Sequence, residues 1–373
     1  MATAKNNTIG WGLIGCGVIA PTHAKAIKEV KGAKLVACCD VVKERAESCA
    51  KEHGTTRTKV YTDLEKMLED PNVDAVSVCT PSGMHADNGI MAAQAGKHIL
   101  CEKPMDVSLH KIDAIIAAAE DNNVKLAGVF QRRTYAINKE VREAVRSGTL
   151  GKLVLGCSYQ KYFRSHEYYA SGDWRATWEL DGGGALMNQG VHGIDLLLFL
   201  MGDIKRLSAR CRTLVRNIEV EDTAIATVEF VNGALGTIEG TTSVTPGMGC
   251  NTTICGDAGT IVLEGDKLTL WDVPGAEDAM EAEEKADDGA ARDAKAGLGA
   301  QGHVAHIGDL VDAIWNDREP AIPGREARRA VEVIKAIYLS ARRGGDNVEL
   351  PLSYEDDGPG IDYQAARSAE WDI

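Results

Sequence analysis

The first residues that could do chemistry lie in an otherwise apolar stretch. The stretch 181–201 starts with Asp181 and three glycines and continues into residues typical of a buried helix. Asn188, His192 and Asp195 are spaced by four and then three residues, so a helix would place an amide, an imidazole and a carboxylate on one face. Buried polar groups need hydrogen-bond partners or a ligand. The triplet therefore indicates either a hydrogen-bonded core histidine or a histidine that exchanges a proton with a substrate.

A second candidate is the lysine of Glu102-Lys103-Pro104, which follows the apolar run 97–101. Lysine is seldom buried without a partner, so its place at the end of a strand-like run needs a reason. A structural interpretation pairs Lys103 with Glu102. The functional interpretation, which we favour, puts a desolvated ammonium beside a substrate hydroxyl or carbonyl oxygen, where it can share a proton. Lys103 and His192 then form a candidate pair around one reacting oxygen.

A glycine-rich turn precedes both groups in the chain. It is the segment Gly15-Cys16-Gly17-Val18-Ile19-Ala20, which lies between an apolar run over 8–14 and a helix-like segment over 21–30, with a second apolar run over 33–39. In such a strand–turn–helix–strand unit Gly15 allows the tight turn, Gly17 lets a pyrophosphate approach, and the helix N-terminus attracts its charge. Asp40 ends the second run, where a carboxylate binds an adenosine ribose and repels a 2′-phosphate, so NAD is favoured over NADP. The alternative is a glycine turn without a ligand.

The elements that must position these residues alternate through the first third of the chain. The predicted helices and strands continue over 43–53, 63–68, 75–79, 83–95, 97–101, 108–122 and 125–129. This alternation predicts a parallel sheet covered on both faces, with ligands at the carboxyl ends of the strands. Gly15, Asp40, Thr80, Lys103 and Gln131 should therefore gather along one edge.

After residue 150 the pattern changes to consecutive strands. They are predicted over 152–163, 206–215, 223–230, 234–241, 251–255, 259–263 and 267–271. Strands without intervening helices predict a mostly antiparallel sheet, and its open face favours association with another subunit. The polar and aromatic loop 164–178 suits a wall over a sugar, although an ordinary surface loop is the alternative. Two helices, over 303–316 and 324–343, close the chain, and His303 and His306 at the start of the first are expected on the surface.

Composition excludes several classes of function. The chain has 373 residues, 44% of them hydrophobic, and a formal net charge of −14, which disfavours nucleic acid and anionic membrane as partners. No apolar run reaches membrane-spanning length, and the polar start does not fit a secretory signal. Ten cysteines without a Cys-x-x-Cys pair favour reduced thiols, a cytoplasmic location and no metal site. The segment 274–302, rich in Ala, Glu, Asp, Lys and Gly, is expected to be solvated.

Together the glycine turn, Glu102-Lys103-Pro104 and the stretch from Gly183 to Asp195 resemble the Gfo/Idh/MocA oxidoreductases, and the loop 174–178 resembles their sugar 3-dehydrogenase branch. The resemblance implies an α/β protein with two domains. An N-terminal Rossmann NAD-binding domain would cover 1–130, with a helix over 325–345 packing back on it. A C-terminal α/β domain over 131–373, with a large open, mostly antiparallel sheet, would bind substrate and form a homo-oligomer, a dimer or tetramer.

The resemblance also implies roles for individual residues. Many relatives carry Asp where this chain has Asn188, so a proton relay through that carboxylate is absent here. The catalytic residues would be Lys103, His192 and Asn188. The cofactor would contact Gly15, Gly17, Val18, Ile19, Asp40, Thr80, Pro81, His85, Glu102, Lys103, Trp174 and Arg175. The substrate would contact Gln131, Arg132, Tyr162, Arg164, Asn188, His192 and Asp195.

These assignments predict an NAD-dependent enzyme that oxidises a ring secondary hydroxyl, at C3, of a sugar, glycoside or nucleotide sugar. His192 would be the base and Lys103 would assist. One alternative is a redox glycosidase that uses bound NAD with no net redox change. Another is a non-catalytic sugar-sensing or NAD-sensing regulator, which the presence of both Lys103 and His192 disfavours.

Overall fold

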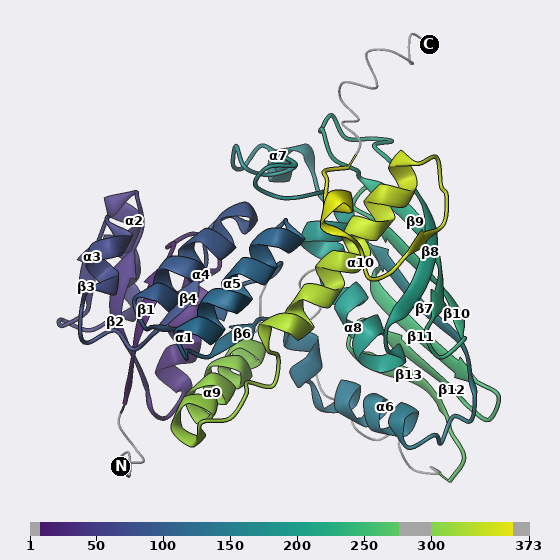
Figure 1. Cartoon of the computed structure of the whole chain (residues 1–373), viewed down its shortest axis with the longest axis horizontal. Coiled ribbons are helices and arrows are strands. Elements are labelled where there is room, and N and C mark those ends of the chain that lie inside the picture. The colour runs from purple at the N-terminus through teal and green to yellow at the C-terminus, as the bar shows by residue number, and fades with distance from the viewer. Residues whose placement is uncertain (1–7, 276–299, 361–373) are drawn as a thin grey trace. The chain divides into compact units, whose positions relative to one another are not determined.

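The computed structural model describes residues 8–275 and 300–360, which form two compact units (Figure 1). Unit 1 contains residues 8–131 and 300–328, and unit 2 contains residues 132–275 and 329–360. Most of the predicted solvated segment 274–302 lies outside the described residues. Within the described ranges, every helix is too short or too polar to cross a lipid bilayer.

Unit 1 is built on a six-stranded parallel sheet with the order β3-β2-β1-β4-β5-β6, which confirms the predicted Rossmann architecture. The two central strands β1 and β4 are buried along their whole length, as expected for a sheet covered on both faces. The strands are β1 Ile9–Ile14, β2 Ala33–Cys39, β3 Lys59–Tyr61, β4 Ala75–Val78, β5 His98–Cys101 and β6 Leu126–Gly128.

The helices of unit 1 form two groups, in which α1 contacts α2 and α9, and α4 contacts α5. Helix α9 returns to this unit because Ile307, Leu310 and Val311 on its apolar face join the core formed around Trp11 and Ile27. Helix α10 starts in unit 1 and continues into unit 2 after residue 328. The elements are α1 Ala20–Glu29, α2 Lys43–His53, α3 Leu64–Leu68, η1 Ser82–Met84, α4 His85–Gln94, α5 Leu109–Asp121, α9 Ala300–Asn316 and α10 Gly324–Arg342.

Unit 2 contains an eight-stranded sheet with the order β13-β12-β11-β7-β10-β9-β8-β14. Only the pair β7 and β10 is parallel in this sheet, so the predicted mostly antiparallel arrangement is confirmed. The strands are β7 Leu153–Lys161, β8 Ile204–Arg212, β9 Thr223–Phe230, β10 Leu235–Thr241, β11 Gly249–Gly256, β12 Thr260–Glu264, β13 Lys267–Asp272 and β14 Val348–Glu349. Side chains alternate along β9, where Ala226 and Val228 are buried and Ile225 is exposed.

The predicted continuous helix after the glycines is two elements, the π-helical segment η3 Ala185–Gly190 and helix α8 Val191–Met201. Helix α8 packs on β7 and β11, as Figure 1 also shows. Helix α6 Ala136–Arg146 and the single turn α7 His166–Tyr169 were not predicted from the sequence. Helix α6 could have been found, because Ile137, Val141 and Ala144 recur at helical spacing.

Asp195 corrects the predicted polar face of this helix. Its side chain is fully buried and accepts a bidentate pair of bonds from Arg133, with Nε 2.8 Å from Oδ2 and Nη2 2.6 Å from Oδ1. The Arg133 guanidinium also lies 5.2 Å from the centre of the Phe199 ring. A carboxylate so placed is neutralised inside the protein and is not presented to a substrate, because a buried charge is retained only when it is paired.

We expect Asp195→Ala to lower the free energy of unfolding by about 3–5 kcal/mol, because the buried guanidinium of Arg133 loses its counter-charge. Urea denaturation measures this change. The double variant Arg133→Met/Asp195→Leu is the matched control and should be less destabilised than the single variant. A single variant as stable as the wild type would contradict the prediction.

Candidate active site

The glycine turn at the carboxyl end of β1 fits a dinucleotide. Gly15 has a φ of +85°, and a Cβ there would lie 2.8 Å from the Cys79 carbonyl oxygen, so the backbone itself requires glycine. A Cβ on Gly17 would meet nothing within 4 Å, which leaves open space beside the backbone. Ile19 occupies the N-cap of α1 and its aliphatic side chain cannot cap the helix; Pro21 has no N–H group and that of Thr22 donates to the Ile19 carbonyl, so a phosphate is expected near the Ala20 N–H group and the positive end of the helix dipole.

Asp40 holds this turn in place from the end of β2. Its two carboxylate oxygens accept hydrogen bonds from the backbone N–H groups of Cys16 and Val42, both at 2.8 Å. The side chain is mostly buried, and each oxygen keeps a second lone pair. Open space at Gly17, an uncapped helix N-terminus and a carboxylate after β2 together fit NAD, while the contact of Asp40 with a ribose stays a prediction.

Glu102, directly after β5, is the centre of a buried polar network. Its Oε1 atom lies 2.8 Å from Nε2 of His23 on α1 and 3.0 Å from Nε2 of His303 on α9. Nδ1 of His23 lies 3.0 Å from the Ser77 hydroxyl, which accepts the indole N–H of Trp11. Because a carboxylate only accepts, His23 donates through Nε2 and receives the Ser77 hydroxyl at Nδ1.

The network keeps Glu102, the residue before Lys103, in its charged form. Burial alone would raise the pKa of Glu102, but hydrogen bonds from His23 and His303 hold it well below its ordinary value. Burial lowers the pKa of His23, which favours the neutral imidazole. Oε2 of Glu102 accepts the backbone N–H of Lys103 at 3.1 Å. Glu102 therefore fixes the backbone at the partly exposed Lys103, and His303 and His306 are both buried rather than on the surface as predicted.

His85 also lies inside unit 1 instead of presenting its ring to a ligand. Its side chain is buried, with Nδ1 2.7 Å from the Pro104 carbonyl and Nε2 2.8 Å from the Thr80 carbonyl. Thr80 and Pro81 follow β4 and are partly exposed. His85 thus links the ends of β4 and β5. These internal contacts favour a supporting position for His85 over a direct contact with the cofactor.

In unit 2 the described stretch from Asp181 to Met201 leaves only Asn188, His192 and Phe199 partly exposed. Asn188 donates its amide to Oδ1 of Asp181 at 2.8 Å. The side chains around Asn188 and His192 in this stretch are buried, so the imidazole and the amide are its two accessible polar groups. They are four residues apart, as the sequence analysis required.

Glu221 fixes the start of this stretch and was missed from the sequence. Its carboxylate accepts hydrogen bonds from the backbone N–H groups of Gly184 and Leu186 and from the Tyr338 hydroxyl, each at 2.9 Å. A Cβ on Gly184 would lie 1.8 Å from the Glu221 carbonyl oxygen, which explains the glycine. Two consecutive acidic residues, Glu221 and Asp222, before the strand predicted over 223–230 were the available signal.

Tyr168 is a second residue that the sequence analysis missed, and it connects the aromatic loop to η3. Its hydroxyl accepts from Arg175 Nη1 at 2.8 Å and from Gln189 Nε2 at 2.9 Å. The guanidinium groups of Arg164 and Arg175 lie 5.3 and 4.4 Å from the centre of its ring. The Arg175 guanidinium also lies 4.5 Å from the centre of the Trp174 ring, in the same unit.

The remaining predicted substrate contacts make internal contacts. Arg132 is buried with Nε 3.3 Å from Oδ1 of Asp266, so this ion pair argues against a substrate role. Tyr162 is buried beneath Arg164, whose guanidinium lies 5.8 Å from the ring centre. Gln131 is partly exposed, and its Nε2 atom lies 3.3 Å from Nε2 of His303.

Comparison with known proteins matches both units. Residues 9–130 match the model described as "Oxidoreductase family, NAD-binding Rossmann fold", and residues 138–262 match the GFO/IDH/MocA C-terminal domain. Myo-inositol 2-dehydrogenase of Thermotoga maritima is 31% identical over 69% of this chain and 76% of its own length. The Escherichia coli D-glucoside 3-dehydrogenase is 28% identical over 60% of this chain and 67% of its own. The crystal structure of the WlbA dehydrogenase from Bordetella pertussis, in complex with NADH and UDP-GlcNAcA, superposes with a TM-score of 0.81 at 33% identity and covers 93% of this chain and 100% of that one.

The two glycines of the turn should respond differently to alanine. We expect Gly17→Ala to leave the unfolding free energy within about 0.5 kcal/mol of wild type, as for substitutions away from tight packing, and to weaken NADH binding because the methyl group enters the open space. Gly15→Ala should lower both the free energy of unfolding and the affinity for NADH, because the added Cβ collides with the Cys79 carbonyl. Urea denaturation and NADH fluorescence titration measure the two effects. Equal NADH affinity in Gly17→Ala and wild type would refute the proposed phosphate approach.

Glu221 should give unit 2 a pH-dependent stability. Burial outweighs its three hydrogen bonds and raises the pKa of Glu221 to about 7 from an ordinary value of 4.5. The folded protein then holds a proton that the unfolded chain has lost, so the stabilisation is complete below pH 4.5 and is lost as the pH rises to about 7.

The comparison with Glu221→Gln, which cannot titrate, isolates this effect. The difference in unfolding free energy between wild type and variant should shrink through the same pH window and stay constant above it. Denaturation at a series of pH values measures it. A difference that does not change with pH would show that Glu221 does not titrate there.

Proposed function

The chain belongs to the GFO/IDH/MocA family of NAD-binding oxidoreductases, and on that premise we propose that it oxidises a ring secondary hydroxyl, at C3, of a sugar, glycoside or nucleotide sugar. The name of the D-glucoside 3-dehydrogenase supports this position on the ring. The WlbA dehydrogenases of Bordetella pertussis and Chromobacterium violaceum, at 33% and 32% identity, were crystallised with UDP-GlcNAcA, which supports a nucleotide sugar.

The observation that carries the proposal is the exposure pattern of one buried stretch. Between Asp181 and Met201, Asn188 and His192 are the partly exposed polar residues, and both lie near the junction of η3 and α8. Apolar packing and the Asp195–Arg133 pair account for the buried residues of helix α8, and a partly exposed histidine at this position suits contact with a substrate. Histidine is the side chain best suited to take up a proton near neutral pH.

Each residue then has one role in the reaction. Bound NAD⁺ supplies the hydride acceptor. His192 takes the proton of the substrate hydroxyl, and Lys103 donates a hydrogen bond to the same oxygen as negative charge develops on it. Asn188 has no proton to exchange, so it orients the hydroxyl or the imidazole. Glu102 acts through Lys103 by fixing the backbone of the strand end.

The loop around Tyr168 supplies the substrate side of unit 2. The partly exposed guanidinium group of Arg175 lies 4.4 Å from the centre of the Tyr168 ring, whereas that of Arg164, at 5.3 Å, is buried, so Arg175 is the cation that this loop can offer to a substrate. Arginine binds carboxylate and phosphate through paired N–H donors. This charge favours a substrate that carries an anionic group, as a nucleotide sugar does.

We expect His192→Ala to reduce kcat by about 10²–10⁴-fold, the usual contribution of a general base, while the Kd for NADH stays unchanged. Lys103→Ala should also reduce kcat, and Lys103→Arg should recover part of it by restoring the positive charge. Formation of NADH from NAD⁺ with UDP-sugars and glucosides measures turnover. His110→Ala, which removes an exposed histidine of α5, is the control. Turnover by His192→Ala at the wild-type rate would exclude His192 as the base.

A further inference from the structure

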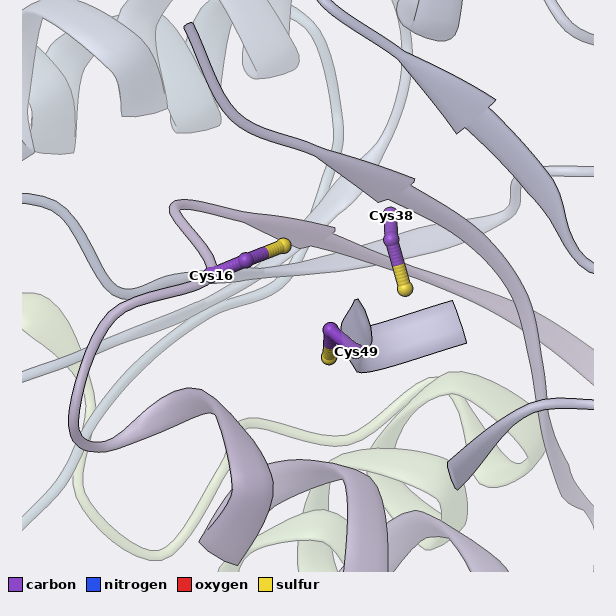
Figure 2. A group of neighbouring side chains, drawn as sticks. All are labelled: Cys16, Cys38 and Cys49. Atoms are coloured by element: carbon purple, nitrogen blue, oxygen red, sulfur yellow. The ribbon is translucent and has the colours of Figure 1, made fainter. Parts of the chain in front are cut away.

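Three cysteines from separate elements of unit 1 converge beneath the glycine turn. Cys16 lies in the turn, Cys38 on β2 and Cys49 on α2, and Figure 2 shows their sulfur atoms at the corners of a triangle. The three Sγ atoms lie within 4.8 Å of one another. All three side chains are buried, with relative exposures of 9%, 0% and 6%. This cluster was not predicted from the sequence, because the cysteines are separated by 22 and 11 residues.

The geometry of this group matches a metal site. Zinc–thiolate bonds are about 2.3 Å long, so three sulfur atoms around one ion stand roughly 4 Å apart. The observed spacing therefore needs only small side-chain movements to close around an ion. The surrounding core includes Leu13 and Ala46, which are apolar and offer no oxygen ligand from their side chains. Three soft ligands without a hard one select thiophilic d¹⁰ ions such as Cu(I), Zn(II) and Cd(II).

A second group of possible metal ligands in unit 1 differs because its members are already hydrogen-bonded to one another. His23, Glu102 and His303 are already joined by hydrogen bonds of 2.8 and 3.0 Å, which satisfy the carboxylate and fix the rings. An ion there would have to break this network. The thiol cluster instead contains weak donors and acceptors, so replacing their contacts with metal–sulfur bonds costs little.

We propose that Cys16, Cys38 and Cys49 bind one thiophilic d¹⁰ metal ion through their three sulfur atoms. Three metal–sulfur bonds form, the thiol protons leave to solvent, and no electron is transferred. None of the three ligands takes part in the chemistry of the proposed sugar oxidation, so metal binding can be tested without it.

The position of Cys16 couples the site to the cofactor. Cys16 stands between Gly15 and Gly17, and its backbone N–H is bound to Asp40. Because Cys16 belongs to the turn, even a small shift of its sulfur toward β2 and α2 on metal binding is expected to alter the backbone that a pyrophosphate approaches. Metal loading therefore weakens NADH binding, and NADH weakens metal binding by the same factor.

The direct test is titration of the full-length reduced protein with Cd²⁺, followed by the ultraviolet thiolate-to-metal charge-transfer band and by native mass spectrometry. We expect one ion per chain. Cys38→Ser and Cys49→Ser should each weaken binding by at least about tenfold, the loss seen even for outer-sphere changes. Cys39→Ser is the matched control, because this neighbouring cysteine is equally buried and lies on the opposite face of β2.

Binding of no ion, or equal binding by wild type and both cluster variants, would overturn the site. Circular dichroism and NADH titration of Cys49→Ser and Cys38→Ser establish that the variants are folded, so a lost band reports the ligand and not unfolding. In the second arm, the Kd for NADH should rise several-fold on loading the wild type and stay constant for Cys38→Ser. An unchanged Kd in the loaded wild type would overturn the coupling. Neither arm depends on turnover of a sugar.

Discussion

The compensation of buried carboxylates is the constraint on which the polar parts of this protein depend. A carboxylate removed from water is stable only when its oxygens are fully hydrogen-bonded or paired with a positive charge. Glu102 is held by His23 and His303 and Asp195 by Arg133, while Glu221 is held by two backbone N–H groups and Tyr338 and burial still raises its pKa to about 7. These three acids sit at element ends or on the buried helix, and each fixes a segment that carries a candidate site residue.

The consequence for the proposed chemistry is pre-organisation. Glu102 fixes the strand end that carries Lys103, and Glu221 fixes the backbone at the start of the segment that carries Asn188 and His192. A reacting group must be held closely to be effective, and holding it with buried hydrogen bonds costs no reorganisation during the reaction. Few polar residues of this segment are accessible, because the neighbouring polar residues form buried hydrogen bonds that hold the segment in place. The same logic makes Asp40 a support of the glycine turn as well as a candidate ribose ligand.

Much of the fold could be predicted from the sequence. Hydrophobic periodicity and glycine punctuation placed all but one of the strands of the parallel sheet and all but one of the strands of the antiparallel sheet, because both signals are local. The short strands β3 and β14 were missed, since three and two residues carry no usable period. The split of one helix into η3 and α8 was also missed, and the start of η3 is bound by Glu221, which lies 35 residues beyond Leu186 in the chain.

The sequence by itself determined the dinucleotide turn, the lysine after β5 and the spacing of Asn188 and His192, because each is encoded within a few consecutive residues. Only the tertiary structure decided which polar residues form internal contacts that stabilise the protein. Asp195 and Arg132 proved to be buried ion-pair members, His85 and His303 proved to be internal, and Cys16, Cys38 and Cys49 proved to be neighbours. The physical reason is that burial and pairing depend on which distant elements pack together, and that information is not present in local spacing.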